Sequence, residues 1–253
     1  MKPVRGIGMI RMKKKKIISI LVLLFLIISI GAYKIIFKHD IRKSNEPVDK
    51  VVEQTKEEVV VDYNQVINDL KKEYYNNDIV GILEIENSDY VVPILQGGDN
   101  EYYLNHDAYG NSTYMGAIYL DYRVDINNSK KLLIYGHNSQ TIDMPFKILE
   151  NYYNVDYYKE HKYIDITTNK EKRVYEVFSV YVEAKDFNYM NVLFNNEDEY
   201  NNHLKELKSK SMYETETDIE SEDDLLILQT CSTHKDYIGY NKKYLLISLK
   251  RIK

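Results

Sequence analysis

Short apolar runs separated by polar turns fill most of the chain after residue 78. The turns are rich in Gly, Asn and Asp, and several of the runs alternate apolar with polar residues, which is typical of β-strands. Eight such runs occur, at 79–86, 90–96, 116–122, 131–137, 162–168, 173–184, 224–230 and 243–249. Because strands greatly outnumber helices, the pattern predicts a mainly β (α+β) domain built as a closed β-barrel.

Two helices are predicted beside these strands. The first lies at 62–74, where apolar residues recur every three or four positions. The second lies at 195–211, begins with an Asn/Glu capping pattern and places Tyr200, Leu204 and Leu207 on one face. The sequence therefore predicts one helix before the barrel and one inserted late in it.

The N-terminal region has the pattern of a membrane anchor. Residues 17–37 are apolar except for Lys34. A helix of this length can span a bilayer. Residues 1–16 are basic and lack acidic residues, so the positive-inside rule places them in the cytoplasm. We predict an anchor at 17–37, an extracellular linker at 38–61 and an extracellular folded domain at 62–253. A cleaved signal peptide is the alternative, although "GAY" is a poor cleavage site.

Charge and composition narrow the functional classes. Residues 1–38 hold nine basic and no acidic residues, so the remainder has 34 − 9 = 25 basic against 39 acidic residues, a net charge of −14. Such a surface does not favour nucleic-acid binding. The single cysteine excludes an internal disulfide and a cysteine-based zinc site. With no glycine-rich phosphate loop and no acidic cluster at metal-ligand spacing, we predict no metal and no cofactor.

The lone thiol is the strongest candidate for chemistry. Cys231 directly follows the apolar run at 224–230, and His137 ends the run at 131–137 just after Gly136. Strand ends are where a rigid scaffold presents catalytic side chains. An imidazole can stabilise a thiolate and then return the proton to a leaving group, so this pair suggests a cysteine nucleophile. A buried cysteine that only packs is the alternative.

Other histidines could serve as the partner. His106 lies in a polar loop, and His234 lies three residues after Cys231, so both are further candidates. Solvent exposure is expected for the histidines in the linker, in a charged turn and on the late helix: His39, His161 and His203. The order of histidine before cysteine, 231 − 137 = 94 residues apart, differs from that of papain-like proteases. "QTCST" matches the caspase signature only in part.

The two strand-end motifs resemble those of the sortases, membrane-anchored cysteine transpeptidases of Gram-positive bacteria. "ILQTC" at 227–231 is similar to the sortase Thr-Leu-x-Thr-Cys signature, with Ile in place of the first Thr, and "KLLIYGHN" precedes it in the chain. The segments "YVVPILQGGDNEYYLNHD", "GAIYLDYR" and "FNNEDEYNNHLKELKSKSMY" further resemble class B sortases. From about residue 62 to the end, the resemblance implies a sortase catalytic domain, an eight-stranded β-barrel with its site at one end.

This resemblance also implies a reaction. Cys231 would attack the Thr-Gly or Thr-Asn bond in the C-terminal sorting signal of a surface protein and form a thioacyl enzyme. His137 would protonate the leaving amine and then deprotonate the incoming amine of a peptidoglycan peptide. These steps require no metal and no organic cofactor. The implied partners are the substrate protein, the cell-wall amine and the membrane.

The chain departs from the family at one catalytic position. Sortases carry an arginine on the strand after the cysteine, and alignment of the apolar core of that strand places Lys243 there. A lysine supplies charge without the planar fork of a guanidinium. Arg251 lies eight residues further on, roughly 26 Å along an extended strand, which is too far. Arg123 is an alternative donor. Lys242 is adjacent to Lys243, and strand alternation lets only one of the two face the site; both could also be ordinary charges of an edge strand.

Further site residues follow from the resemblance alone. Gln229 occupies a position usually held by serine, so its contact with substrate is in doubt. The substrate-binding residues implied by the class B pattern are Asn100, Leu104, Tyr189, Met190 and Thr230.

Two other functional classes stay open at this stage. The first is a tethered binding module that keeps the barrel without turnover, which the lysine at 243 makes conceivable. The second is a cysteine endopeptidase, in which water resolves the thioacyl intermediate.

Overall fold

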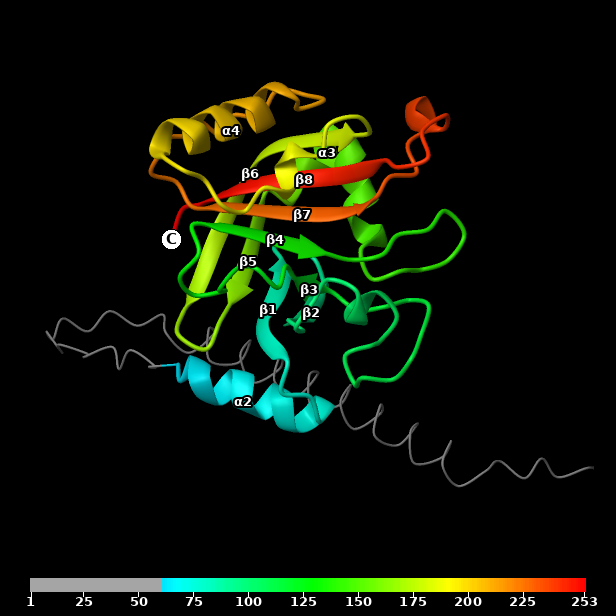
Figure 1. The fold of residues 1–253 in the computed structure, drawn as a ribbon, viewed down its shortest axis with the longest axis vertical. Helices are drawn as coiled ribbons and strands as arrows, with labels where there is room; N and C mark the ends of the chain where they lie inside the picture. The colour runs from blue at the N-terminus through cyan, green and yellow to red at the C-terminus, as the bar shows by residue number, and fades with distance from the viewer. Residues whose placement is uncertain (1–60) are drawn as a thin grey trace, which may run out of the picture. The chain divides into compact units, whose positions relative to one another are not determined.

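Eight strands close into a barrel in the computed structural model, which describes residues 61–253 (Figure 1). Around the barrel the order is β1-β2-β3-β4-β7-β8-β6-β5, with β2–β3 and β4–β7 parallel and the other pairs antiparallel. The strands are β1 (Ile79–Ile85), β2 (Val91–Leu95), β3 (Tyr119–Leu120), β4 (Lys131–Tyr135), β5 (Tyr163–Thr167), β6 (Lys172–Glu183), β7 (Leu225–Cys231) and β8 (Tyr244–Arg251). Each overlaps one predicted run, so the predicted mainly β barrel is confirmed.

Both predicted helices are present and capped. In α2 (Tyr63–Tyr74) the Asp62 carboxylate accepts a bond from the backbone N–H of Gln65 at 3.0 Å. In α4 (Glu197–Ser209) the Asn196 side chain accepts one from Glu199 at 2.8 Å. Each cap satisfies a backbone donor that the first helical turn leaves without a partner. In Figure 1, α2 lies beside β1 and α4 lies over β6.

The sequence pattern did not predict a helical segment between β4 and β5. It consists of η3 (Lys147–Tyr153) and α3 (Val155–Glu160), and it buries Leu149, Tyr152 and Tyr158. Pieces this short offer too few positions for a helical period to become visible. The segment packs those side chains into the barrel core.

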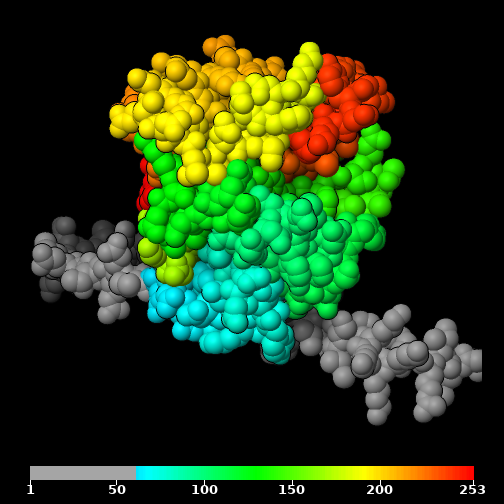
Figure 2. Space-filling model, viewed as in Figure 1, coloured from blue at the N-terminus to red at the C-terminus, as the bar shows by residue number. Residues whose placement is uncertain are grey.

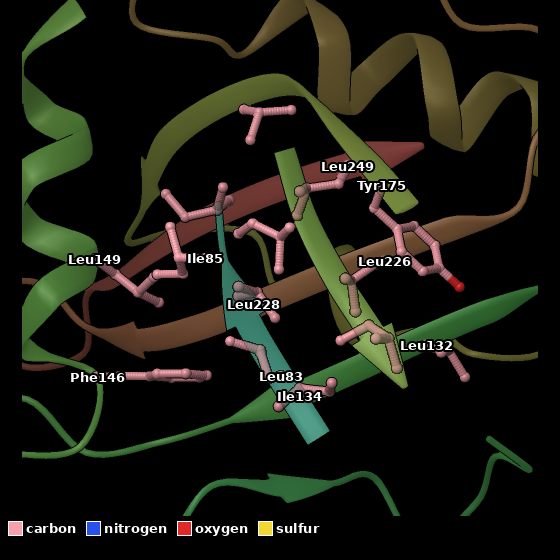
Figure 3. Close-up of a cluster of buried hydrophobic side chains, with 14 of the residues drawn as sticks. Leu83, Ile85, Leu132, Ile134, Phe146, Leu149, Tyr175, Leu226, Leu228 and Leu249 are labelled. Atoms are coloured by element: carbon pink, nitrogen blue, oxygen red, sulfur yellow. The ribbon is translucent and has the colours of Figure 1, made fainter. Parts of the chain in front are cut away.

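Alternate residues of β7 face two different apolar clusters. Leu226 and Leu228 belong to the cluster inside the barrel (Figure 3), whereas Leu225 and Ile227 belong to one outside it that includes residues of α4. We call these the inner and outer faces. Because both faces are buried, the strand reads as a continuous apolar run rather than as an alternating one. This alternation also decides on which face each side chain at the end of the strand lies.

One expectation about the late helix is wrong. His203 was expected to face solvent, but only 6% of it is exposed, and its Nε2 lies 2.9 Å from Nζ of Lys131, which is 2% exposed. The same Nζ donates to the backbone oxygens of Tyr189 at 2.7 Å and Asn191 at 2.6 Å. The spacing of three from Tyr200 places His203 on the buried helical face.

Segments predicted in the N-terminal region lie outside the described residues, namely the cytoplasmic segment, the anchor at 17–37 and all but the end of the linker. Within residues 61–253, no helix is both long and apolar enough to cross a membrane.

Protonation of His203 provides a test of this packing. Burial is the main cause that lowers the pKa of His203 to about 3, and the nearby Lys131 contributes in the same direction. In the unfolded chain the pKa is about 6.5, so between these values the unfolded chain binds the extra proton and the folded one does not. The stability that neutral His203 contributes is therefore present above pH 6.5 and is lost as the pH falls toward 3.

We expect the stability advantage of the native chain over His203→Gln to shrink below pH 6.5, by at most about 1.4 kcal/mol per pH unit. Urea unfolding of both proteins between pH 7 and pH 4 measures this difference. Asn202→Ala, an exposed change on the same helix, should run parallel to the native chain. A constant difference between native and His203→Gln over this range would contradict the prediction.

Candidate active site

The parallel pairing of β4 with β7 brings the two candidate catalytic residues together. Tyr135 pairs with Gln229, an offset of 229 − 135 = 94, and His137 and Cys231 have the same offset, 231 − 137 = 94. The pairing continues past the end of β4, because Gly136 N–H donates to the Gln229 oxygen at 3.2 Å. By strand alternation both His137 and Cys231 lie on the outer face. They are neighbours across two strand ends.

Close packing fixes these strand ends. The Thr230 hydroxyl donates to the Gly136 oxygen at 2.8 Å, and the Asn138 side chain donates to the Cys231 oxygen at 2.9 Å. A Cβ at Gly136 would lie 2.5 Å from Ile118, so only glycine fits before the histidine. Thr230 is 1% exposed and does not line the groove over these strand ends. Its side chain lies on the inner side and supports the strand ends, and its contact with substrate stays a prediction.

A groove of about 370 Å³ lies over the two strand ends. Figure 2 shows this part of the molecule, where segments far apart in sequence (green, yellow and orange-red) come together. Among the described residues that line the groove, none is Lys, Arg, Asp or Glu. The lining consists of Asn100, Leu104, Tyr119, Tyr135, Gly136, His137, Met190, Gln229, Cys231 and Tyr244. Within residues 61–253 no group of three or more His, Cys, Asp or Glu could hold a metal ion.

The His137 ring is held by a backbone carbonyl. Its Nε2 lies 2.8 Å from the oxygen of Leu104, in η2 (Tyr102–Leu104). Since a carbonyl only accepts, Nε2 carries the proton and Nδ1 keeps its lone pair in the neutral ring. Gly116, with φ of 62°, permits this contact, because a Cβ there would lie 2.8 Å from the Leu104 oxygen and 2.9 Å from His137 Cδ2. The arrangement leaves Nδ1 as the proton acceptor.

Cys231 is a resting thiol rather than a preformed thiolate. Its side chain is exposed on the groove side, yet surrounding atoms remove enough water for burial to raise its pKa. Within the described chain no hydrogen bond joins its sulfur to His137. A raised pKa of the thiol means that little thiolate is present at neutral pH.

A buried carboxylate that the sequence reasoning missed organises the groove. Asp121, 0% exposed, follows β3 and accepts bonds from the Tyr135 hydroxyl at 2.7 Å, Asn100 Nδ2 at 3.0 Å and Arg123 Nη2 at 2.7 Å. Arg123 Nη2 also donates to the Met190 oxygen at 3.0 Å. Three groove residues are thus tied to one ion pair. The signal in the sequence is a carboxylate inside an apolar run with Arg two residues later.

Asp121 is ionised in spite of its burial. Burial by itself raises the pKa of this carboxyl, but the bonds from Arg123, Tyr135 and Asn100 act in the opposite direction and together hold the pKa below its usual value. A buried charge of this kind is stable only when it is paired and fully hydrogen-bonded. Arg123 is therefore committed to the groove wall and does not line the groove itself.

Predicted substrate-binding residues fall into two groups. Asn100, Leu104 and Met190 line the groove, and Met190 is 38% exposed in η4 (Asn188–Met190). Tyr189 is buried behind them, and its hydroxyl donates to Gln229 Oε1 at 3.0 Å. Gln229, which was in doubt, lines the groove.

Lys243 is not brought into the groove. It precedes β8, where Leu245 belongs to the inner cluster and Leu246 to the outer one, so alternation directs Lys243 to the inner side and Tyr244 to the outer side. Tyr244 is the direct partner of Cys231 and lines the groove. Tyr244 is thus the residue at the start of β8 that shares the face of Cys231, and the catalytic role of Lys243 stays a prediction. Sequence reasoning missed Tyr244 because register cannot be read from an apolar run.

The remaining candidates lie elsewhere. His106 Nδ1 is 2.8 Å from the Tyr102 oxygen, and its ring stacks on Tyr102. The His234 ring packs edge-on against Tyr153, and its Nδ1 accepts a bond from the backbone of Asp236. Neither histidine lines the groove. Arg251, as expected, is remote, with ion pairs to Glu171 and Asp224.

Comparison with known proteins yields consistent matches. A family model described as the sortase domain matches residues 83–249. Sortase B of Listeria monocytogenes is 33% identical over 173 residues, 68% of this chain and 69% of that protein. A Staphylococcus aureus sortase B–substrate complex has a TM-score of 0.67 at 29% identity, over 75% of this chain and 86% of that chain. A crystal structure of sortase B complexed with triglycine has the same TM-score and coverage at 30% identity.

Alkylation tests the resting state of the thiol. Because the chain has one cysteine, the mass of the intact protein reports Cys231 alone. A raised pKa means less thiolate at neutral pH, so the rate of reaction with iodoacetamide should still be rising above pH 8.5, about the pKa of free cysteine. A short unstructured peptide with one cysteine is the control. A plateau already at pH 7 would contradict the prediction and indicate a preformed thiolate.

Proposed function

Because this chain belongs to the sortase family of cysteine transpeptidases and is class B-like, we propose that it anchors surface proteins to the cell wall. In this proposal it cleaves a C-terminal sorting signal after threonine and transfers the protein to the amine of a peptidoglycan peptide. The observation that carries the proposal is the shared offset of 94 residues, which places His137 and Cys231 side by side at one groove.

The first half-reaction forms a thioester. His137 Nδ1 accepts the thiol proton while the sulfur adds to the scissile carbonyl carbon, and the electron pair of the C=O bond moves to the oxygen. When the intermediate collapses, the C–N bond breaks and the leaving amine takes the proton from His137. Nε2 keeps its bond to the Leu104 oxygen throughout, so the ring is oriented in both protonation states.

The second half-reaction is aminolysis of the thioester. His137, neutral again, takes a proton from the incoming amine as the amine attacks the carbonyl carbon; the C–S bond then breaks, and the leaving thiolate takes that proton from His137. The sortase B crystal structure with triglycine supports an amine of the oligoglycine kind as acceptor. The nucleophile and the proton carrier of both steps are side chains of this chain.

The neutral groove suits an uncharged peptide segment. We assign Asn100, Leu104 and Met190 to contact with the sorting signal, since each lines the groove beside Cys231. The Staphylococcus aureus sortase B solved with a substrate supports a peptide in this position. Tyr189 and Thr230 act from behind, on Gln229 and on the strand ends.

The N-terminal sequence supports a location at the cell membrane. In this proposal residues 17–37 span the bilayer once, residues 1–16 stay in the cytoplasm and the barrel is extracellular, in a Gram-positive cell. There the barrel meets both exported substrates and the growing wall.

Acyl transfer can be tested directly on the full-length chain with a library of short sorting-signal peptides. We expect an adduct on Cys231, visible in the intact protein mass, and its release as a peptide amide when triglycine is added. Cys231→Ala should form none, and His137→Ala should form it about 10² to 10⁴ times more slowly.

The outcomes separate the three functional classes. If a hydrolysed peptide appears at the same rate with or without triglycine, the protein is an endopeptidase. If peptides bind but no peptide in the library yields an adduct, the protein is a binding module and the proposed function fails.

Gly116 tests the positioning of His137. A Cβ at this residue would lie 2.6 Å from the oxygen of Tyr103 and 2.8 Å from that of Leu104, so Gly116→Ala has to move the carbonyl that holds the ring. Misplacement of a catalytic group by about 1 Å can lower a rate by about 10²-fold, so we expect at least a tenfold slower acylation.

Gly98→Ala is the matched control, since no atom lies within 4 Å of its added Cβ, and it should acylate at the native rate. Circular dichroism should establish that both variants are folded. A folded Gly116→Ala protein with the native acylation rate would contradict the assigned role of this glycine.

A further inference from the structure

A hydrogen-bond donor for the reacting carbonyl oxygen is required by the chemistry described above. When the sulfur adds, negative charge develops on that oxygen, and a donor positioned in advance stabilises it. Among the described residues that line the groove, none carries a fixed positive charge, and Arg123 donates both to Asp121 and to the Met190 oxygen. Neutral groups around Cys231 are therefore the candidates for this donor.

The tyrosines around the groove differ in what their hydroxyls contact. Tyr119 donates to the Asn100 oxygen at 3.1 Å, Tyr135 to Asp121 at 2.7 Å, and Tyr189 to Gln229 at 3.0 Å. In residues 61–253 no hydrogen bond uses the hydroxyl of the fourth, Tyr244. Three hydroxyls therefore build the groove, and the fourth is available to a ligand.

Tyr244 is also placed beside the reacting atom. It is the direct cross-strand partner of Cys231, and side chains of such a pair stand on the same face with Cβ atoms about 5 Å apart. Its ring is fixed by edge contacts to Phe187, with centroids 5.8 Å apart, and to Tyr189, at 6.4 Å. A ring held on two sides keeps its hydroxyl in a defined direction.

The hydroxyl keeps its proton under working conditions. Burial raises the pKa of Tyr244 above its ordinary value, and the nearby Cys231 adds to this shift. A phenol that stays neutral next to a thiolate donates a hydrogen bond without repelling the nucleophile. It can do so without transferring its own proton.

We propose that the Tyr244 hydroxyl donates the hydrogen bond that stabilises the oxyanion formed when Cys231 adds to the scissile carbonyl. Tyr244 is then a catalytic residue, and the sortase reaction in this chain runs with a neutral donor in place of a cation. This inference rests on the proposed thioacyl chemistry. The bond is made in both half-reactions, because the same tetrahedral carbon forms in each.

Removal of this single oxygen tests the assignment. In full-length Tyr244→Phe we expect the rate of thioacyl formation to fall about 10²-fold or more, with little change in KM, because the lost bond strengthens only in the transition state. Alkylation of Cys231 by iodoacetamide forms no oxyanion, so its rate should be unchanged. Tyr240→Phe, which removes a hydroxyl from the loop before β8, should acylate like the native chain.

The results that would overturn the inference about Tyr244 differ from the result that would overturn the proposed function. Native-rate acylation by Tyr244→Phe would overturn the inference, as would a rate loss found in Lys243→Ala or Gln229→Leu but not in Tyr244→Phe. Equal losses of acylation and alkylation in Tyr244→Phe would assign it a structural role and overturn the inference as well. If the native chain forms no adduct with any peptide, the proposed function fails, and alkylation still reports whether the thiol is intact.

Discussion

The register between two parallel strands is the constraint on which the site depends. β4 and β7 pair with an offset of 94 residues, and every consequence for His137 and Cys231 follows from that number. A slip of one residue would place the imidazole and the thiol on opposite faces of the barrel. Two features prevent this slip. Each strand is buried on both faces, and the Thr230 hydroxyl donates a hydrogen bond to the Gly136 oxygen next to His137 and Cys231. The catalytic pair is therefore a property of the core, and the loops only complete it.

The charged residues beside the groove hold its lining residues in position. Asp121 and Arg123 form the one ion pair next to the groove among the described residues, and together they hold Asn100, Tyr135 and Met190. A buried carboxylate with several donors imposes one geometry on all of them, because any donor that leaves exposes an uncompensated charge. The result is a rigid groove with a neutral lining. Rigid neutral walls suit a reaction whose charges appear only transiently, at the sulfur, the imidazole and the carbonyl oxygen.

Much of this arrangement was predictable from the sequence, and the errors have identifiable physical causes. All eight strands were visible because their apolar runs are bounded by turn residues, and both catalytic candidates were visible because each ends such a run. Tyr244 was missed because an apolar run such as "YLLISL" looks the same when shifted by one residue, whereas the pairing of Tyr244 with Cys231 depends on hydrogen bonds between strands. His203 was misjudged by residue type alone, although its helical spacing already placed it on the buried face. The sequence could not show that Asp121 is important for the site, because its hydrogen-bond partners come together only in the folded chain.

A neutral groove also determines how the enzyme discriminates among nucleophiles and substrates. Since no described residue of its lining carries a fixed charge, we expect selectivity to come from shape and from single hydrogen bonds, which lose their strength when water enters. Three of the tyrosine hydroxyls around the groove donate hydrogen bonds to protein atoms. They therefore stiffen the groove and are not free to bind other ligands. The Tyr244 hydroxyl, by contrast, takes part in no hydrogen bond within residues 61–253. The same arrangement fits a thiol at rest: burial raises the pKa of Cys231, and in the proposed reaction the thiol loses its proton to His137 only when a carbonyl is in place.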